Sequence, residues 1–357
     1  MEEYAINLLP RLFSLQRSIK FKLFYNALRK KRLDYPWIGD SNVELCQFSI
    51  PNRFLQASSF FFYWPKIDKL IGGADVFFSP HFILAPVSRQ CRKIITFHDL
   101  SFEYRPEFFS LQRKIWHKLM RPKFQAKTAD RIITVSRSTK DDLTELYKIP
   151  SEKIEVIYPG IGEEFRKMEK FEIQKVREKY NLPQKFILYF GTIEPRKNIE
   201  GIINAFELLK TDAKLVIAGS PGWIYKSVYK TAKKSKRSKD IIFTGFIEKE
   251  DKPALYNLAE VFVYPSFFEG FGFPPLEAMA CGTPTIVSDV TSLPEVAGEA
   301  AIMVNPYNIN EIAQAMNDVL ENEELRRQMR DGGLVLSKKF SWQNCAKATL
   351  KILAGDN

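Results

Sequence analysis

Short apolar runs alternate with helical patterns along the chain, and this alternation constrains the fold more than any other feature. The runs are rich in β-branched and aromatic residues and are bounded by polar or turn residues, which is typical of buried strands. They cover 43–48, 74–78, 93–97 and 131–135 in the first half, and 186–190, 214–218, 241–244, 261–264, 285–288 and 301–304 in the second. Helical patterns between them include 111–128, 139–147 (with Ser138 as the expected N-cap), 199–209 and 249–259. This order predicts an α/β fold with mainly parallel, doubly wound, Rossmann-like sheets.

The length of 357 residues allows two such domains. We predict a first domain over 1–165, a charged linker over 166–183, and a second domain over 184–340. The amphipathic segment 341–357 is expected to pack back toward the first domain. Ligands of doubly wound sheets bind beyond the carboxyl ends of the strands. We therefore expect the ligand in a cleft where the two sheets present those ends to each other.

The composition, 45% hydrophobic and 27% charged, is typical of a soluble globular protein. No apolar run reaches the roughly 18 residues of a membrane-spanning helix, and no signal peptide is visible. The four cysteines are scattered without a C-x-x-C pair, which argues against a disulfide framework or a zinc site. The sequence therefore predicts a cytoplasmic protein.

Positive charge is concentrated in the first half of the chain. The net charge is +11, and residues 1–165 carry 26 basic against 18 acidic residues. Such a surface can meet nucleic acid, an anionic membrane or a phosphorylated substrate. The stretch from Arg11 to Arg32, which has eight basic residues and no acidic one, is either a solvated face or a patch for anionic lipid on the inner membrane surface. Nucleic acid is disfavoured because no aromatic–basic motif accompanies the charge.

The most informative stretch is 265–284, PSFFEGFGFPPLEAMACGTP, in which seven residues separate Glu269 from Glu277. An apolar strand precedes it, and a glycine-bearing loop leads through two prolines into a helix, which Gly282 closes. The free N–H groups and positive dipole of a helix N-terminus suit a phosphate. Two carboxylates on either side can hold hydroxyl groups. Together these features favour a nucleotide sugar as the ligand, although Glu277 taken alone is better explained as an acid stabilised by the helix dipole.

A second junction, GTIEPRKN at 191–198, also lies between a strand and a helix. Arg196 and Lys197 would project near the helix N-terminus, where a diphosphate can be bound. Taken alone this signal is weak, because surface lysines are common. His98 follows a predicted strand end and is a candidate for the site or a simple loop cap. The three histidines are dispersed and no D-x-D motif is present, so we expect no metal site.

Four stretches in order, FGTIEPRKN, TGFIEKED, YPSFFEGFGFPPLEAMACGTP and SLPEVAG, resemble the retaining glycosyltransferases of family 4, which have the GT-B fold. In the first half, FHDLSFEYRPEFF and RIITVSRSTKDDL are similar to the bacterial polysaccharide mannosyltransferase branch. The resemblance covers nearly the whole chain and is most specific over 186–306. It implies two Rossmann-like domains, transfer with retention of the anomeric configuration, and no cofactor or metal.

The resemblance also implies roles for individual residues. Catalysis would rest on Glu269, His98 and Lys197, with Glu269 holding the transferred sugar, His98 reaching toward it and Lys197 neutralising the diphosphate. Glu277 would bind the ribose. The remaining donor-binding residues would be Arg196, Gly245, Phe246, Gly270, Phe271, Gly272 and Phe273.

The function implied is transfer of a hexose, best mannose from GDP-mannose, although a UDP-linked donor stays open. The acceptor would be lipid-linked or a polysaccharide in cell-surface glycan synthesis. Two alternatives are a truncated, non-catalytic nucleotide-sugar-binding paralogue and another GT-B enzyme such as a nucleotide-sugar epimerase. The first is prompted by the start of the chain, which has no glycine before Gly39. The resemblance then implies that the first strand and the glycine-rich loop are absent and that residues 1–357 are weakly stable or poorly active.

Overall fold

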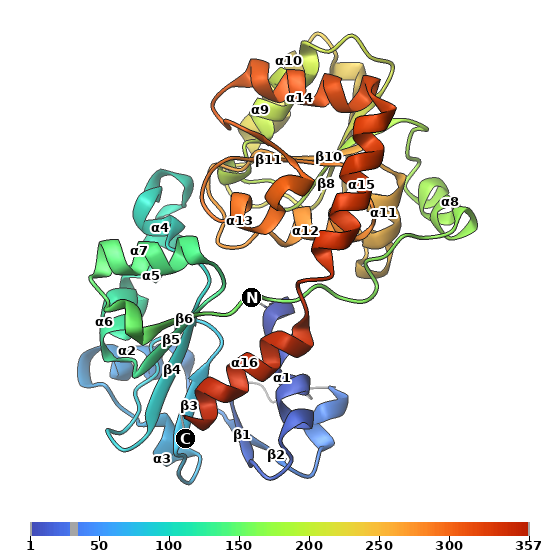
Figure 1. Cartoon of the computed structure of the whole chain (residues 1–357). Coiled ribbons are helices and arrows are strands. Elements are labelled where there is room, and N and C mark those ends of the chain that lie inside the picture. The colour runs from blue at the N-terminus through green and yellow to red at the C-terminus, as the bar shows by residue number, and fades with distance from the viewer. Residues whose placement is uncertain (1, 29–34, 356–357) are drawn as a thin grey trace. The chain divides into compact units, whose positions relative to one another are not determined.

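The computed structural model describes residues 2–28 and 35–355, which pack into two compact units (Figure 1). The first unit contains the chain up to Leu100, Leu111–Gly160 and the chain from Ser341 on. The second contains Ser101–Ser110 and Ile161–Phe340. The ten residues from Ser101 thus pack with the second unit, and the boundaries predicted near 165, 183 and 340 stay a prediction.

The second unit is built on one six-stranded parallel sheet in the order β12-β11-β10-β7-β8-β9. Each strand begins and ends within one residue of its predicted run, and the predicted parallel arrangement is confirmed. The strands are β7 (Phe186–Phe190), β8 (Lys214–Ala218), β9 (Ile241–Gly245), β10 (Val261–Tyr264), β11 (Thr285–Ser288) and β12 (Ile302–Val304).

Helices cover both faces of this sheet. In Figure 1, α9, α10 and α14 lie on one side and α11, α12 and α13 on the other, and α9 packs against both α10 and α14. The helices are α4 (Ser101–Tyr104), α8 (Lys170–Lys179), α9 (Ile199–Glu207), α10 (Lys226–Lys234), α11 (Lys252–Leu258), α12 (Phe273–Ala280), α13 (Leu293–Ala297), α14 (Ile309–Glu321) and α15 (Glu323–Ser337).

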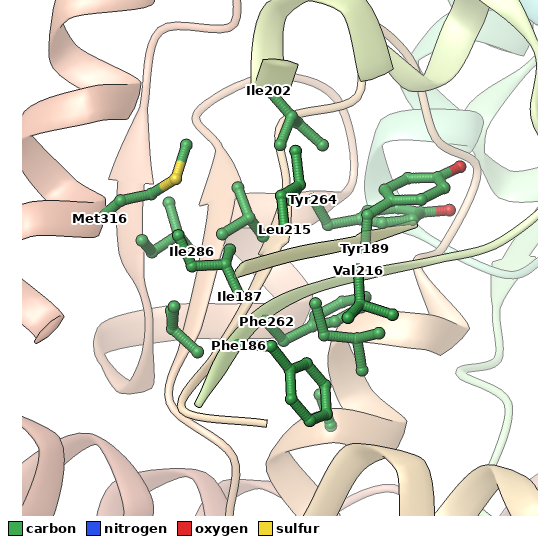
Figure 2. Close-up of a cluster of buried hydrophobic side chains, with 14 of the residues drawn as sticks. Phe186, Ile187, Tyr189, Ile202, Leu215, Val216, Phe262, Tyr264, Ile286 and Met316 are labelled. Carbon is green, nitrogen blue, oxygen red and sulfur yellow. The ribbon is translucent and has the colours of Figure 1, made fainter. Parts of the chain in front are cut away.

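The core of the second unit explains why its strands are apolar almost throughout. Parallel strands covered on both faces have no solvent side on which polar residues could alternate. Figure 2 shows Phe186, Leu215 and Phe262 among these side chains, and all three are fully buried. Tyr189 and Tyr264 belong to the same cluster, with stacked rings whose centroids are 5.9 Å apart.

The strands of the first unit form two separate parallel sheets, β1-β2 and β3-β4-β5-β6. Lys22 on β1 donates hydrogen bonds to the carbonyls of Ile71, Gly72 and Gly73, which precede β3, over 2.9, 3.3 and 3.1 Å. The strands are β1 (Phe21–Asn26), β2 (Val43–Phe48), β3 (Val76–Ser79), β4 (Arg92–Phe97), β5 (Arg131–Thr134) and β6 (Ile154–Val156). That a strand is missing from this unit stays a prediction.

The helices of the first unit correct two local predictions. The helix predicted over 111–128 is broken, because Arg121 is left-handed (φ 49°) ahead of Pro122, which starts a new helix. The N-cap of the next helix is Ser136 rather than Ser138: its Oγ accepts from the Thr139 N–H over 3.1 Å. The helices are α1 (Glu2–Leu15), α2 (Asn52–Phe62), α3 (Ile67–Leu70), α5 (Leu111–Met120), α6 (Pro122–Thr128), α7 (Arg137–Tyr147) and α16 (Trp342–Ala354).

Part of the basic stretch that sequence singled out, Arg29, Lys30, Lys31 and Arg32, lies outside the described residues. The C-terminal helix α16 packs against α1 in the first unit. Over residues 2–28 and 35–355, no helix combines the length and apolar character that crossing a bilayer requires.

Three adjacent strands of the second unit, β7, β8 and β9, are followed or ended by glycines that bring their backbones together. Gly219 has φ +130°, and a Cβ there would lie 2.0 Å from the carbonyl oxygen of Gly191. The Gly219 N–H donates to the Gly245 carbonyl over 2.8 Å. Gly245 also has positive φ (+72°), yet no atom lies within 4 Å of its Cβ position.

We expect Gly219→Ala to lower the free energy of unfolding by about 3 kcal/mol or more, because backbone must move as well as adopt a strained φ. The matched control Gly245→Ala should cost only about 1 kcal/mol, from positive φ alone. Thermal and urea unfolding of the full chain measure both. Equal losses would contradict the close approach of the strand ends.

Candidate functional site

The strand order of the second unit indicates where on its sheet a ligand site is expected. From β7 the chain builds outward through β8 and β9, then returns to add β10 on the other side of β7. β7 and β10 are therefore neighbours across the position where the order reverses, with Val261 opposite Ile187. Loops that leave such a position diverge and leave room for a ligand beyond the carboxyl ends. The loops here are 191–198 and 265–272, the two stretches that the sequence singled out.

Glu269, on the loop after β10, binds two cations on the loop after β7. Its Oε1 lies 2.6 Å from Nζ of Lys197, and its Oε2 lies 3.0 Å from a guanidinium nitrogen of Arg196. Glu269 is 6% exposed and Lys197 is 7% exposed, so the ion pairs are buried. The structure thus brings together three of the predicted site residues, from positions more than 70 residues apart in the chain.

Glu194 completes the cluster. Its Oε1 accepts from Nε of Arg196 over 3.0 Å, and its side chain is buried. Arg196 also donates to the Phe268 carbonyl over 2.8 Å, and its own carbonyl accepts from the Phe267 N–H over 2.9 Å. The two cations and two carboxylates balance formally, so their mutual attraction offsets part of the free energy lost when these charges are taken out of water.

The cluster keeps Glu269 ionised. Burial by itself would raise the pKa of Glu269, but Arg196 and Lys197 outweigh it and lower the pKa to about 2. Burial, followed by repulsion from Arg196, lowers the pKa of Lys197 and so opposes the same ion pair. We take the pair as charged, because Glu269 has two cations within 3.0 Å.

Neighbouring side chains fix Lys197 and the loop in place. Lys197 Nζ donates to the hydroxyl of Tyr264, the last residue of β10. The Glu269 N–H donates to Oγ1 of Thr291 over 3.0 Å. Ser292 Oγ contacts the carbonyls of both Glu269 and Phe271 at 3.0 Å. A hydroxyl has one proton, so it donates to one of them at a time.

The helix α12 begins directly after this loop. Its N-cap is Gly272, which has φ +106°, and a Cβ there would lie 2.6 Å from a methyl carbon of Leu293. Only glycine fits this turn without displacement. Phe271 is 4% exposed and packs against the rings of Phe273 and Phe340, with centroids 5.1 and 5.7 Å away.

Glu277 lies on α12 and has a different partner from Glu269. The Tyr256 hydroxyl donates to its Oε2 over 2.8 Å. Burial, and then Glu277 itself, raise the pKa of Tyr256 well above its usual range, so the phenol stays protonated and can donate. Gly245 ends β9, and the side chain of Phe246 that follows it is 65% exposed. A solvent-facing aromatic ring at a strand's carboxyl end is able to stack on a planar ligand.

His98 belongs to the first unit, whereas the other predicted site residues belong to the second. Its Nε2 lies 2.8 Å from the Pro80 carbonyl, and its ring meets the edge of Tyr4 at a centroid distance of 4.9 Å. Burial lowers the pKa of His98 to about 4, so the ring is neutral near pH 7.

The comparisons with known proteins show which family the chain belongs to. A family model described as Glycosyltransferase Family 4 matches residues 15–165, and one described as Glycosyl transferases group 1 matches 170–334. The O-antigen chain mannosyltransferase B of Escherichia coli is 34% identical over 281 residues, 77% of this chain and 73% of that protein. This chain belongs to glycosyltransferase family 4.

Further relatives carry similar names. The serotype-specific mannosyltransferase WbdA of Escherichia coli is 38% identical over 62% of this chain but only 28% of its own length. Among solved structures, Anabaena HepE in complex with UDP and glucose aligns with a TM-score of 0.74 at 16% identity, over 99% of this chain and 96% of that one. The glycosyltransferase WaaG aligns with a TM-score of 0.73 at 15% identity, over 98% of this chain and 95% of that one. These structures confirm the predicted GT-B fold.

Several residues of this glycosyltransferase site were not predicted from sequence. They are Glu194, Asn198, Tyr264, Thr291 and Ser292. Glu194 and Asn198 stand inside the GTIEPRKN stretch, so their proximity to Arg196 and Lys197 was the available signal. Asn198 donates to the carbonyls of Pro265 and Pro306 over 3.1 and 2.7 Å, a contact that no sequence spacing indicates.

That the protein has no metal site stays a prediction. Within the described part of the chain, no three side chains of the His, Cys, Asp or Glu type gather as ligands of one ion would. This observation does not decide what the reaction needs.

The charge of Glu269 predicts how stability depends on pH. A carboxyl group whose pKa falls on folding stabilises the folded state above its ordinary value, near 4.5, and loses that contribution as pH falls toward 2. Glu269→Gln should lower the free energy of unfolding by about 3 kcal/mol at neutral pH, because Lys197 is left buried without its partner. The deficit relative to wild type should shrink as the pH falls below about 4.5.

Unfolding monitored at a series of pH values from neutral to about 3 measures this difference. Glu299→Gln, at an exposed position of the same unit, is the matched control and should leave the curve unchanged. A deficit that stays constant through the acid range would mean that Glu269 is not the stabilising anion.

Proposed function

We propose that this family 4 glycosyltransferase transfers a hexose with retention of configuration from a nucleotide sugar, best mannose from GDP-mannose. The acceptor is lipid-linked or a polysaccharide, and the reaction serves cell-surface glycan synthesis on the cytoplasmic side of the membrane. Similarity to proteins named O-antigen chain and serotype-specific mannosyltransferases supports the sugar and the pathway class. The observation that carries the proposal is the buried Glu269–Lys197–Arg196 cluster at the strand-order reversal.

The cluster suits a donor diphosphate because Glu194 and Glu269 hold Arg196 and Lys197 in one place before the donor binds. The two carboxylates also neutralise the two cations, so the cations can be kept there without an excess of positive charge. A diphosphate would draw the two cations away from Glu269 and would also meet the N-terminus of α12, whose backbone N–H groups supply positive potential. Glu269, released from part of its pairing, can then accept hydrogen bonds from sugar hydroxyl groups. Because Arg196, Lys197 and Glu269 are then already oriented toward the donor, these side chains need to move less as the transition state forms.

The proposed step conserves atoms and charge without a protein base. The bond between the anomeric carbon and the diphosphate oxygen breaks, and the acceptor hydroxyl oxygen bonds to the same face of that carbon. The acceptor proton passes to the departing phosphate oxygen, and the nucleoside diphosphate leaves. Arg196 and Lys197 stabilise the negative charge that develops on the leaving group. Glu277, held by Tyr256, binds the ribose hydroxyl groups, and Phe246 lies along the base.

We expect Glu269→Gln to reduce turnover of the preferred donor by about a hundredfold or more, because an oriented charge is lost where the transition state forms. Release of nucleoside diphosphate from a panel of GDP- and UDP-sugars measures turnover, and calorimetry measures donor binding. Glu299→Gln serves again as the control. Donor binding without any turnover in the wild type would favour the non-catalytic alternative. An epimerised free sugar would favour the epimerase.

Tyr256→Phe tests the role of Glu277 separately. The ring stays in its buried place, but Glu277 loses a 2.8 Å hydrogen bond and is no longer oriented. We expect the KM for the donor to rise several-fold, by up to about tenfold, with little change in kcat, because only uniform binding is lost. Steady-state kinetics at several donor concentrations measure the two constants. A fall in kcat at unchanged KM would place Glu277 closer to the reacting atoms.

A further inference from the structure

We propose that one face of the first unit docks on an anionic lipid bilayer. The face consists of Leu111, Ile115 and Leu119 on α5 together with Phe61, Phe62 and Trp64 at the end of α2, and we call it the α5–α2 surface. These six side chains are 73%, 51%, 43%, 73%, 79% and 55% exposed, respectively. Large apolar side chains gathered at this exposure mark an interaction site on a protein surface.

The apolar stripe of α5 points outward, which is unusual for a helix of a globular protein. Leu111, Ile115 and Leu119 recur at four-residue spacing and so share one face, about 12 Å long. An amphipathic helix normally turns this face toward the core. The residue of α5 that is buried is Met120. The exposed stripe is therefore additional to the residue that anchors the helix.

Direct contacts place the end of α2 beside α6 and the residue that joins α5 to α6. The guanidinium of Arg121, the residue between α5 and α6, lies 5.4 Å from the ring of Phe60 and 4.4 Å from that of Phe124. It also donates to the Phe60 carbonyl over 3.4 Å. The ring of Tyr63 meets the edge of Phe124 at 5.7 Å. The end of α2 thus packs on Arg121, which follows the last residue of the stripe, Leu119, by two positions.

The two segments that carry this surface contain charges of one sign only. Residues 111–128 contain six Lys and Arg and no acidic residue, and residues 51–66 contain two and no acidic residue. Lys114, Lys118 and Lys123 are exposed. Apolar and aromatic side chains flanked by cations match the boundary between acyl chains and anionic headgroups. Long basic side chains can bury their stems there and keep their charges at the headgroups.

The same charges disfavour a second copy of this surface as the occupant. A symmetric contact would set the cationic rim of one copy against that of the other. The cores of protein interfaces are also depleted in lysine, whereas this stripe has Lys114 and Lys118 interleaved with it. An anionic bilayer satisfies the apolar stripe and the rim together.

The inference rests on the proposed function for its purpose, because an enzyme that acts on a lipid-linked acceptor gains from being held at the membrane. Its test does not depend on that function. Vesicle binding is measured without donor or acceptor, and donor hydrolysis is measured without vesicles.

The experiment compares co-sedimentation of the full chain with vesicles of phosphatidylcholine alone and with vesicles containing about 30% phosphatidylglycerol. We expect binding to the anionic vesicles only. The triple variant Leu111→Ser, Ile115→Ser, Leu119→Ser should bind at least about tenfold more weakly, because three buried aliphatic side chains are lost from the contact. Val335→Ser, at a position that is 63% exposed in the second unit, should bind as wild type does.

A second pair of variants separates this surface from charge alone. Lys114→Gln with Lys118→Gln should weaken binding about thirtyfold, at roughly 1 kcal/mol for each cation near the headgroups. The control is Lys233→Gln with Lys234→Gln on α10. This helix has four lysines against three Lys and Arg in α5, and its apolar residues Val228 and Ala232 are buried. We expect no change there.

Three outcomes would overturn the proposal. They are failure of the wild type to sediment with anionic vesicles, equal binding by the triple variant, and a dimer in sedimentation velocity that only the triple variant abolishes. The second would point to charge elsewhere in the chain, and the third to a second copy as occupant. Unchanged donor hydrolysis and thermal unfolding in the triple variant show that the enzyme itself is intact.

Discussion

A buried carboxylate held between two cations determines how the carboxyl edge of the second unit is arranged. Glu269 joins the loop after β10 to the loop after β7 through Lys197 and Arg196. Because both loops leave the sheet where the strand order reverses, this pairing defines the geometry of the place where we propose that the donor binds. Glu194 and Tyr264 then fix the two cations from the other side. Removal of one member leaves the others buried without compensation, so the cluster acts as a unit.

Such a cluster is a poor device for stability alone. A well-packed apolar group of the same volume often stabilises a fold as much as a buried ion pair does, or more. The surrounding core, with Phe186, Leu215 and Phe262 fully buried, has no need of polar reinforcement. Charges kept at this edge, with the pKa of Glu269 lowered to about 2, are therefore better explained by the chemistry they permit. The glycines at neighbouring strand ends fit this view, since they bring backbone close where side chains would block access.

The sequence predicted the strands of the second unit and three members of the charged cluster, Glu269, Lys197 and Arg196, because period and turn chemistry are local properties. It did not predict how charges pair. Glu194 stands two residues from Arg196, but its role depends on the fold of their loop. Pro306 and Phe267 hold that loop from elsewhere in the chain, through hydrogen bonds to Asn198 and Arg196. Two local features of the helices were also predicted wrongly. Ser136 and Ser138 are both plausible N-caps, and the sequence alone does not choose between them. Within 111–128, only Pro122 indicated that the helix breaks at Arg121. The separation of the first unit's strands into two sheets depends on pairings that no local pattern encodes.

The net charge of the sequence did not indicate what the protein binds, because it does not show which charged side chains are exposed or what surrounds them. The +11 of the chain includes Arg196 and Lys197, which are neutralised inside the second unit and contribute little to its surface. It also includes the lysines of α10, which surround no apolar stripe, and those of α5, which do. An amphipathic helix has the same sequence period whether its apolar face is inside or outside. The cations of α5 differ from the rest because Leu111, Ile115 and Leu119 lie among them in solvent. That combination, rather than the sum of charges, is what distinguishes a lipid surface from water as the preferred neighbour.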